Sequence, residues 1–443
     1  MKRFYQLLNA VLCASAIALT AVSCEENMNE SYLGAITVTL EAPETYPDMP
    51  LSGLQVTILN TTDGVRDTVI SDNDGKAFFE ELTAGSYNIS VNGTYDNATI
   101  NGVSNGVLVV SQETTEVTVA LTAVFQDPMG PYSGLVIKEI FYSGHSMNYD
   151  PMGAAMLKDQ FIELYNNSER TIYLDGLHIA DAWTPATADF ESAPLVSILE
   201  DPTLDHSFLY ANIVIKVPGN GEDHPLEPGE SFLIATNAIN FKSEVQAAAD
   251  EYGMGDLVVL DHIIDLSTAD METYAVQWLQ SQGREGNEYF DFDNPDVPNM
   301  ENVYLSEIND YFLWEMSGSA PFIFMPEKEL GTEDIIIYTY QPQNSTTDKE
   351  MALMRIPVEC VIDGADFVND MESAKWKRLP DSIDIGFGYI PNDNGSMTNF
   401  SQRRKVDSEA SAKAGRTILQ DTNNTTNDFE PVDPPTPKGG YAE

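Results

Sequence analysis

Apolar and polar residues alternate over the first folded part of the chain. In the run 36–40, Ile36, Val38 and Leu40 alternate with two threonines, which is the period of a half-buried strand. Six similar short runs follow, separated by turns rich in Asp, Asn and Gly, at 54–58, 68–70, 77–79, 87–91, 107–110 and 117–121. Short strands at this spacing predict a seven-strand β-sandwich over residues 34–126.

A second region, residues 132–429, follows a linker at 127–131 that contains Pro and Gly. It begins with the apolar run Leu135–Ile140, and further strand-like runs lie at 322–324, 335–338, 351–356 and 358–362. The sequence therefore predicts a mainly β protein of two or three domains, because 443 residues are too many for one compact core. Pro and Gly dominate from 430 to 443, which predicts a disordered tail.

Two short helices are expected inside the second region. Apolar residues recur at helical spacing along one face of 241–252, at Phe241, Val245, Ala248, Ala249 and Tyr252. A second stripe consists of Met271, Tyr274, Trp278 and Leu279, with Asp270 as the expected N-cap and Gly283 after the helix end. Such stripes are usually core contacts, so we expect both helices to pack on the β domain.

The first residues of the chain predict export from the cytoplasm. Lys2 and Arg3 precede an apolar run from Leu7 to Val22, which is shorter than the roughly 20 apolar residues of a membrane-spanning helix. Small residues lead from this run to Cys24. A charged start, a short apolar core and small residues before a cleavage point predict a secretory signal peptide over residues 1–23.

The residues around the cleavage point indicate a lipid anchor. Ala21-Val22-Ser23-Cys24 resembles the lipobox of bacterial lipoproteins, which implies a diacylglyceryl thioether on Cys24 and an acylated amine. Several acyl chains hold a protein stably on a membrane, because each buried CH₂ contributes about 0.8 kcal/mol. Glu25 and Glu26 resemble the acidic export tag of Bacteroidota surface lipoproteins. The resemblance implies the outer face of the outer membrane, with residues 24–33 as a tether.

Two further triplets resemble the O-glycosylation site of the same bacterial group, in which Asp precedes Ser or Thr and an aliphatic residue. They are Asp67-Thr68-Val69 and Asp381-Ser382-Ile383. The resemblance implies glycans on Thr68 and Ser382, although each triplet also fits an ordinary strand edge.

The charge of the chain is strongly lopsided, with 22 basic and 70 acidic residues and a net charge of −48. Such a field repels a phosphate backbone, so we expect no nucleic-acid partner. It is compatible with cations or basic partners, and it also keeps an exported protein soluble. Cys13 leaves with the signal peptide and Cys24 is the lipid site, so Cys360 has no partner for an intramolecular disulfide.

The first β region resembles the carboxypeptidase regulatory-like (transthyretin-like) fold. The resemblance is carried by the segment Ser71–Phe79, by Leu82 and by Gly85-Ser86-Tyr87. It implies an accessory sandwich without catalytic residues.

The second region resembles the lamin-tail type of immunoglobulin-like domain. The run Phe161-Ile162-Glu163-Leu164 ends in Asn, the next strand ends in Leu174-Asp175-Gly176-Leu177, and a Pro-Gly turn at 228–229 leads into another strand. The long stretch between Leu177 and Leu226 departs from that family. We therefore expect an immunoglobulin-like β domain with long insertions that carry short helices, and we expect function on those loops.

As a whole, residues 134–430 resemble a Bacteroidota lipoprotein family of uncharacterised function. The likeness is carried by Lys377-Arg378-Leu379, by Asp384-Ile385-Gly386 and by the run Asp421–Phe429. The resemblance implies no activity.

Catalytic motifs are fragmentary. His224 and Glu227 match the His-x-x-Glu pair of zinc carboxypeptidases, but a catalytic zinc needs a third ligand. Gly144-His145-Ser146 begins like a nucleophile elbow, but Asn148 stands where the second Gly is required. We therefore predict that the protein is not an enzyme and has no required cofactor.

A structural calcium ion is a weaker prediction. Asp291, Asp293 and Asp296 form the densest cluster of hard oxygen ligands, together with Asn294 and Asn299. The EF-hand spacing is broken by Pro295, so the alternative is a solvated acidic loop.

These observations favour a lipid-anchored, non-enzymatic ligand-binding or accessory protein on the cell surface. It would bind a surface glycan or peptide, or act beside a TonB-dependent transporter. Trp183, Trp314 and Trp376 could stack on such a ligand, although Trp is more often part of the core. The first alternative is a fimbrial or adhesive subunit, which would require a donated strand, and the second is a glycan or peptide hydrolase.

Overall fold

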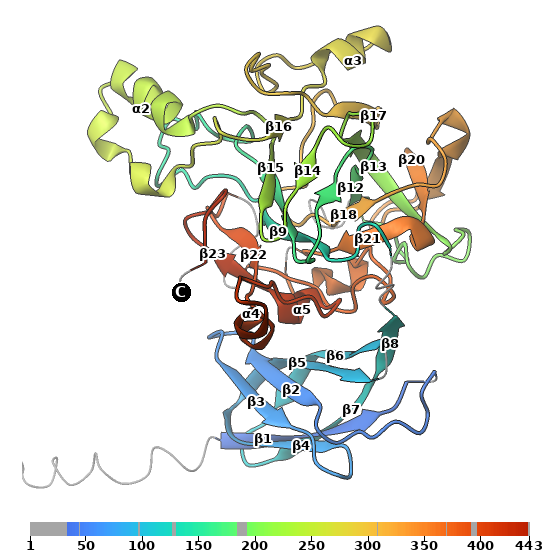
Figure 1. Ribbon diagram of the computed structural model, residues 1–443. Helices are drawn as coiled ribbons and strands as arrows, with labels where there is room; N and C mark the ends of the chain where they lie inside the picture. The colour runs from blue at the N-terminus through green and yellow to red at the C-terminus, as the bar shows by residue number, and fades with distance from the viewer. Residues whose placement is uncertain are drawn as a thin grey trace, which may run out of the picture. The chain divides into compact units, whose positions relative to one another are not determined.

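The computed structural model describes residues 33–43, 45–95, 98–125, 130–183, 193–307, 309–368, 370–390 and 397–441. These residues form a mainly β protein with several antiparallel sheets and few short helices, as the sequence predicts (Figure 1). They divide into two compact units. The first contains the residues up to Val91 and Ser104–Leu121, and the second contains Asn92–Val103 and the residues from Thr122 onward.

Two sheets make up the N-terminal β region, with strand orders β4-β1-β7 and β3-β2-β5-β6-β8. The strands are β1 (Leu33–Glu41), β2 (Gln55–Asn60), β3 (Arg66–Ile70), β4 (Lys76–Thr83), β5 (Gly85–Tyr95), β6 (Ala98–Val109), β7 (Thr114–Ala120) and β8 (Thr122–Phe125). In β1 the side chains of Ile36, Val38 and Leu40 are buried and alternate with half-buried neighbours. The alternation predicted from the sequence therefore forms the core of this region.

The prediction of seven strands is one too few. Only Leu121 separates β7 from β8, but β7 pairs with β1 in one sheet and β8 pairs with β6 in the other. A pattern of alternating residues does not show where a chain passes between sheets, so β7 and β8 resemble one strand in the sequence.

Two larger sheets form most of the second unit. The first has the order β16-β15-β10-β9-β22-β23, and its strands are β9 (Leu135–Phe141), β10 (Phe161–Asn166), β15 (Ser231–Ala235), β16 (Met271–Glu272), β22 (Ser401–Arg404) and β23 (Phe429–Val432).

The second sheet has the order β19-β20-β13-β12-β18-β21, and β17 also pairs with β13. Its strands are β12 (His178–Ala182), β13 (Phe208–Lys216), β17 (Glu301–Leu305), β18 (Pro321–Phe324), β19 (Ile335–Tyr340), β20 (Lys349–Pro357) and β21 (Val361–Gly364). A separate two-stranded sheet pairs β11 (Ile172–Tyr173) with β14 (Pro225–Leu226).

The main core lies between these two sheets. Ile137 of β9 and Ile162 of β10 belong to one fully buried cluster with Ile215 of β13 and Ile323 of β18. The outer face of the first sheet is buried as well, because Phe141, Leu233 and neighbouring residues pack against the helix α2 (Phe241–Glu251). Strands that are buried on both faces have continuous apolar runs, which is the pattern seen at Leu135–Ile140.

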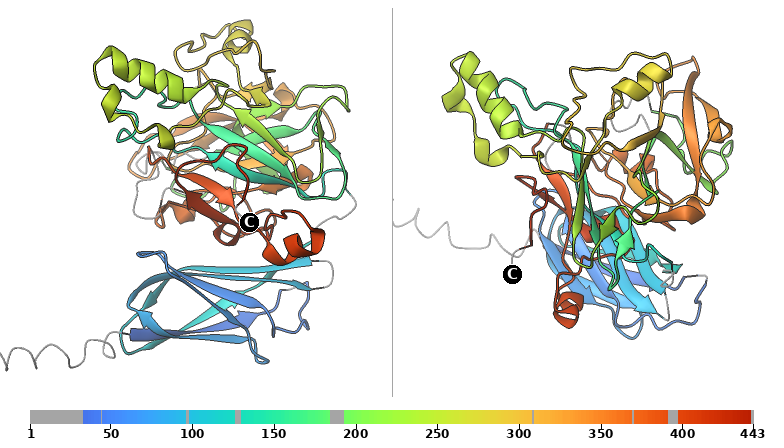
Figure 2. Two further views of the ribbon diagram at one scale, coloured as in Figure 1. Left: turned by 60° about the vertical axis from the view of Figure 1, so that its left-hand side comes forward. Right: turned by 45° about the horizontal axis from the view of Figure 1, so that its top comes forward.

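The helix predicted at 241–252 is confirmed as α2, which Figures 1 and 2 show at the periphery of the second unit. Asn240 is its N-cap, and the Asn240 side chain accepts a hydrogen bond from the backbone N–H of Ser243. The other helices are α3 (Val276–Ser281), α4 (Ser408–Ala414) and α5 (Thr425–Asp428). Short 3-10 turns lie at Gly255–Leu257, Leu260–His262, Thr332–Asp334, Val358–Cys360 and Ser373–Trp376.

The second predicted helix begins later than expected. Met271 and Glu272 pair in parallel with β15, and the helix α3 starts only at Val276. Asp270 is not an N-cap, because its Oδ2 accepts a hydrogen bond of 2.8 Å from the backbone N–H of Leu233. The stripe from Met271 to Leu279 thus joins a strand to a short helix, and both bury apolar residues.

The prediction of a disordered tail from residue 430 is wrong for the described residues up to 441. The strand β23 pairs with β22, and Thr436 donates from its backbone N–H and its hydroxyl to the buried Glu139 at 2.7 and 2.6 Å. Lys138 donates to the carbonyl of Gly439 at 2.9 Å, and the Tyr441 hydroxyl donates to the carbonyl of Arg404 at 2.6 Å. The Pro- and Gly-rich composition conceals these polar partners.

No helix among the described residues is long and apolar enough to cross a lipid bilayer.

Candidate functional site

A cavity of about 350 Å³ lies beside the second sheet of the second unit. It is lined by residues of β12, of β13, of the loop between them and of the segment 378–381, namely Ala182, Trp183, Ile198, Leu199, His206, Phe208, Leu209, Tyr210, Arg378, Pro380 and Asp381. A volume of this size and a largely apolar lining with few polar groups are typical of small-molecule sites. We call this space the β12–β13 cavity.

Aromatic side chains hold one wall of the β12–β13 cavity. The Trp183 ring packs edge-on against Tyr338 and Tyr340, with centroids 5.7 and 5.3 Å apart. These two tyrosines of β19 stack on each other at 5.5 Å. Because the three rings support one another in a common apolar cluster, Trp183 is fixed before any ligand arrives.

The loop that closes the cavity is held by its own polar groups. The Tyr338 hydroxyl donates to Asp201 at 2.7 Å, and the Tyr210 hydroxyl donates to the carbonyl of Asp205 at 3.0 Å. Asp201 also accepts from the backbone N–H of Thr203 at 2.8 Å, as expected for an Asx turn. Burial raises the pKa of Asp201, but hydrogen bonds from Thr203 and Tyr338 outweigh it and the net pKa is lowered. Hydrogen bonds from Ser207 lower the pKa of Asp205.

Arg378 borders the cavity, but its charge is neutralised within the protein. Its guanidinium donates to Asp366 from Nη2 at 2.9 Å and from Nε at 3.2 Å, and both side chains are buried. Nη1 donates to the carbonyl of Gly318 at 2.9 Å. A buried ion pair with these hydrogen bonds is a structural element, so Arg378 is not available to a second anion.

Two apolar side chains of the loop between β12 and β13 are exposed. Leu195 is 56% exposed and Val196 is 42% exposed, and they precede Ile198 and Leu199 in the sequence.

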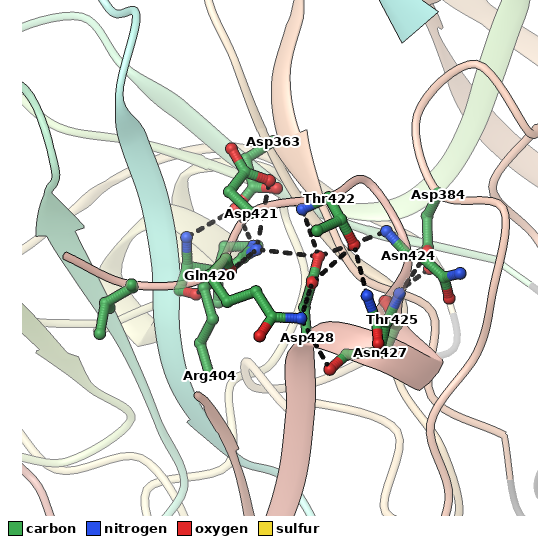
Figure 3. A network of polar contacts seen from close by, with 12 residues as sticks. Asp363, Asp384, Arg404, Gln420, Asp421, Thr422, Asn424, Thr425, Asn427 and Asp428 are labelled. Atoms are coloured by element: carbon green, nitrogen blue, oxygen red, sulfur yellow. Dashed lines mark hydrogen bonds and ion pairs between the residues drawn. The ribbon is translucent and has the colours of Figure 1, made fainter. Parts of the chain in front are cut away.

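A buried polar network surrounds Arg404 on the strand β22 (Figure 3). The guanidinium contacts Asp363 at 2.6 Å, Asp421 at 3.3 Å and Asp428 at 3.6 Å, and Nε donates to the carbonyl of Ile137 at 2.7 Å. Burial raises the pKa of Asp363 to about 7, against the opposing effect of the Arg404 charge. Arg404 is thus the cation that these carboxyls share.

Residues of the run Asp421–Phe429 form further hydrogen bonds of this network. Asp428 accepts from the backbone N–H and the hydroxyl of Thr422 at 2.8 and 2.7 Å, and Asp384 accepts from the same two groups of Thr425 at 2.7 and 2.6 Å (Figure 3). Burial raises the pKa of Asp384 to about 6. The polar residues that carry the resemblance to a lipoprotein family therefore join the C-terminal segment to the two sheets.

The two histidines nearest to a catalytic pattern are engaged in structural contacts. His145 Nδ1 contacts the buried Asp159 carboxyl, and Nε2 contacts the carbonyl of His262 at 3.0 Å. Burial lowers the pKa of His145 to about 4. The Ser146 hydroxyl accepts from the backbone N–H of Asn148 at 3.3 Å, so the Gly144-His145-Ser146 segment forms a turn. His262 Nδ1 contacts Asp433 at 2.7 Å.

His224 and Glu227, which match a fragment of a zinc motif, are engaged in other contacts. The backbone N–H of His224 donates to Asp175 at 2.9 Å, and Glu227 accepts from the Thr171 hydroxyl at 2.9 Å. Within the described ranges no group of three or more His, Cys, Asp and Glu side chains is arranged to hold a metal ion.

The predicted calcium ligands do not come together either. Asp291 accepts from the backbone N–H groups of Ala275 and Val276 at 2.9 and 3.1 Å. Asp293 accepts from the Asn299 side chain at 2.9 Å, and the backbone N–H of Asp296 donates to Asn294 at 3.1 Å. The structure thus does not group Asp291, Asp293 and Asp296 around one position, and a calcium site there stays a prediction.

The predicted modification sites are placed only in part. Cys24, Glu25 and Glu26 lie outside the described residues. Thr68 is exposed on β3, with its hydroxyl 3.0 Å from that of Thr57, and Ser382 is exposed in the turn after Pro380. Both hydroxyls are thus accessible to a modifying enzyme, and glycosylation remains a prediction.

Of the tryptophans suggested as ligand contacts, only Trp183 borders the cavity. Trp314 belongs to the main core and Trp376 is buried beside Ala193. The other lining residues were missed, because they come from 182–183, 198–210 and 378–381, segments that the sequence does not connect.

The fold and the site define a mainly β protein whose second unit carries an aromatic-walled cavity. Residues 227–436 match the model of the family described as "Protein of unknown function (DUF4876)". Over these residues the chain is similar to the DUF4876 family.

Among solved structures, one match covers most of the chain. The crystal structure of a DUF4876 family protein from Bacteroides thetaiotaomicron VPI-5482 is similar with a TM-score of 0.51 and 24% sequence identity, over 89% of this chain and 94% of that one. The Bacillus anthracis TIE protein matches 46% of this chain and 27% of its own length, with 10% identity and a TM-score of 0.18. The full-length major pilin SpaD from Corynebacterium diphtheriae matches 35% and 42%, with 11% identity and a TM-score of 0.17. No curated protein matches the chain.

Proposed function

We propose that this chain is a lipid-anchored surface protein that binds a small ligand, or a side chain of a larger ligand, without chemical conversion. The observation that carries the proposal is the β12–β13 cavity, a concave apolar space with a Trp fixed by two supporting rings. A preformed wall lowers the conformational entropy that a ligand loses on binding. The occupant would be a surface glycan or peptide group destined for uptake.

The location follows from the N-terminal segment. Acyl chains on Cys24, followed by Glu25 and Glu26, would hold the protein on the outer face of the outer membrane. In this arrangement the first unit, which resembles the carboxypeptidase regulatory-like fold in its sequence, is an accessory module. The second unit, with its lamin-tail-like sequence pattern, would present the cavity to a TonB-dependent transporter nearby.

Equilibrium binding tests the cavity directly. The chain from residue 25 onward is titrated with 2-phenylethanol, a neutral probe with an apolar ring, and binding is followed by ligand-observed NMR and calorimetry. Leu199→Trp fills the cavity from its lining, whereas Leu195→Trp makes the same change on the exposed side of the same loop. We expect Leu199→Trp to abolish binding and Leu195→Trp to retain it; equal binding to both variants would refute the proposed site.

The anchor is tested separately. Cells that express the chain are fed an alkyne-labelled fatty acid, and Cys24→Ser serves as the control. Label on the native chain and none on the variant supports the anchor, together with cleavage of the native chain by protease added to whole cells. A native chain without label, or one resistant to protease, contradicts it.

A further inference from the structure

We infer that the β12–β13 cavity selects apolar ligands that carry a positive charge, and that Asp381 is the residue that recognises this charge. The inference rests on the proposed function, because it names the ligand class of the same cavity. The expected occupant is an apolar amine, such as a free hydrophobic amine or the apolar, basic part of a peptide.

The apolar part of the ligand follows from the lining. Eight of the eleven lining residues are aliphatic or aromatic, and the other three are His206, Arg378 and Asp381. Trp183 and Tyr210 offer ring surface, and both are held in place by neighbouring groups. Apolar surface that leaves water on binding contributes roughly 25 cal/mol for each Å². A ligand without an apolar body would therefore gain little binding free energy in the β12–β13 cavity.

The charge of the ligand follows from the three polar residues. The Arg378 guanidinium is paired with Asp366, so its charge is already balanced. His206 is exposed and directly follows Asp205, and its ring interacts electrostatically with the carboxylates of Asp201 and Asp205. Asp381 is exposed at the edge of the cavity and has no ion-pair partner among the described residues. The lining thus presents one unbalanced negative charge.

The rest of the chain strengthens this preference. The net charge of −48 creates a negative potential that attracts cations and repels anions over distances up to the Debye length. An ammonium group next to Asp381 would form a charge-assisted hydrogen bond, which is stronger than one to a neutral hydroxyl. An apolar carboxylate of the same shape would meet repulsion both locally and from the whole chain.

Three probes with nearly the same apolar body separate these effects: 2-phenylethylamine is a cation, 2-phenylethanol is neutral and 3-phenylpropionate is an anion. Each is titrated into the chain from residue 25 onward at low and at physiological salt. We expect the amine to bind about fivefold more tightly than the alcohol, since an exposed ion pair contributes up to about 1 kcal/mol. The carboxylate should bind most weakly, and the differences should shrink with added salt.

Asp381→Asn is the critical variant, and Glu244→Gln on the exposed side of α2 is the control with the same change of net charge. The inference predicts that Asp381→Asn removes the preference for the amine and leaves the affinity for the alcohol unchanged, whereas Glu244→Gln changes neither. A preference that survives in Asp381→Asn overturns the role of Asp381.

The probes also distinguish the inference from the proposed function. If all three bind equally well, the cavity is a ligand site without charge selection, and only the inference falls. If none of the three binds, the proposed site and the inference fall together.

Discussion

Replacing Arg404 by Met should destabilise the second unit strongly while leaving the first unit intact. Arg404 is 1% exposed, and its guanidinium is the shared partner of Asp363, Asp421 and Asp428. Removing one partner of a buried ion pair leaves the other charge uncompensated, which costs about 3–5 kcal/mol. The loss of the hydrogen bond to the Ile137 carbonyl adds to this effect.

A matched control is the ion pair between Lys216 and Glu301. Its atoms are 2.8 Å apart, but the Glu301 side chain is 50% exposed. Ion pairs at the surface contribute about 0–1 kcal/mol, so Lys216→Met should have a small effect. Both variants remove one positive charge from an ion pair, so the difference between their free energies of unfolding reports the effect of burial.

The assay is urea unfolding followed by tryptophan fluorescence. All 4 tryptophans, at 183, 278, 314 and 376, lie in the second unit, so their emission reports on that unit alone. With a denaturant dependence of about 3 kcal/mol per M, a loss of about 3–5 kcal/mol in Arg404→Met should lower the urea midpoint by about 1–1.7 M. The triple variant Arg404→Met, Asp363→Asn, Asp428→Asn should recover part of this loss, because it removes the unpaired charges. Equal midpoints for Arg404→Met and Lys216→Met would refute the reasoning.

Three further predictions concern the same unit. Burial raises the pKa of Glu272 to about 7, above the unfolded value of about 4.3, so this carboxyl takes up a proton on folding near neutral pH. The free energy of unfolding should therefore rise as the pH falls from 8 to 6. Glu272→Gln should reduce the difference between the urea midpoints at these two pH values, and an unchanged difference would contradict the assignment. Thr436→Val replaces the hydroxyl that donates to Glu139 by a methyl group, leaves that buried carboxyl one hydrogen bond short and should cost about 1–3 kcal/mol. Thr436→Ser keeps the hydroxyl and should be near neutral in the same assay, so equal losses in the two variants would contradict the role of this hydrogen bond. Gly318→Ala would place Cβ against the carbonyl oxygen of Phe367, whereas no atom lies within 4 Å of the Cβ that Gly253→Ala would add. Gly318→Ala should therefore lower the thermal midpoint far more than Gly253→Ala. Similar midpoints for the two variants would show that the backbone at Gly318 relaxes freely.

Local patterns predicted the elements of this protein better than their ends. The strands at 135–140, 322–324 and 335–338 and the helix at 241–252 follow from apolar runs or helical spacing, and the structure has β9, β18, β19 and α2 there. The late start of α3 and the extra strand β8 were missed, since both depend on which sheet the chain joins. Such pairings are made between residues far apart in the sequence.

Polar residues were harder to interpret. The sequence shows that Asp421–Phe429 is dense in polar residues, but it does not show that Arg404 provides the cation or that Asp384 provides an acceptor. The same difficulty explains why the tail was predicted to be disordered. Thr436 and Tyr441 hold it in place only through their hydrogen bonds to Glu139 and to the carbonyl of Arg404. Composition describes the average of a segment, whereas one hydrogen bond to a buried charge decides whether the segment packs.

The β12–β13 cavity was beyond prediction for a related reason. Its residues come from two strands and a distant turn, and only Trp183 stood out as a candidate ligand contact. Residue types of this kind are common in cores, so the concave shape supplies the information that the sequence lacks.

The most direct test of a ligand site in this cavity is a crystal structure of the chain from residue 25 onward with 2-phenylethylamine. The account predicts that the ring lies against Trp183 and Tyr210 and that the ammonium group lies within hydrogen-bond distance of Asp381. A probe bound elsewhere, or a cavity filled by the chain's own side chains, would contradict it.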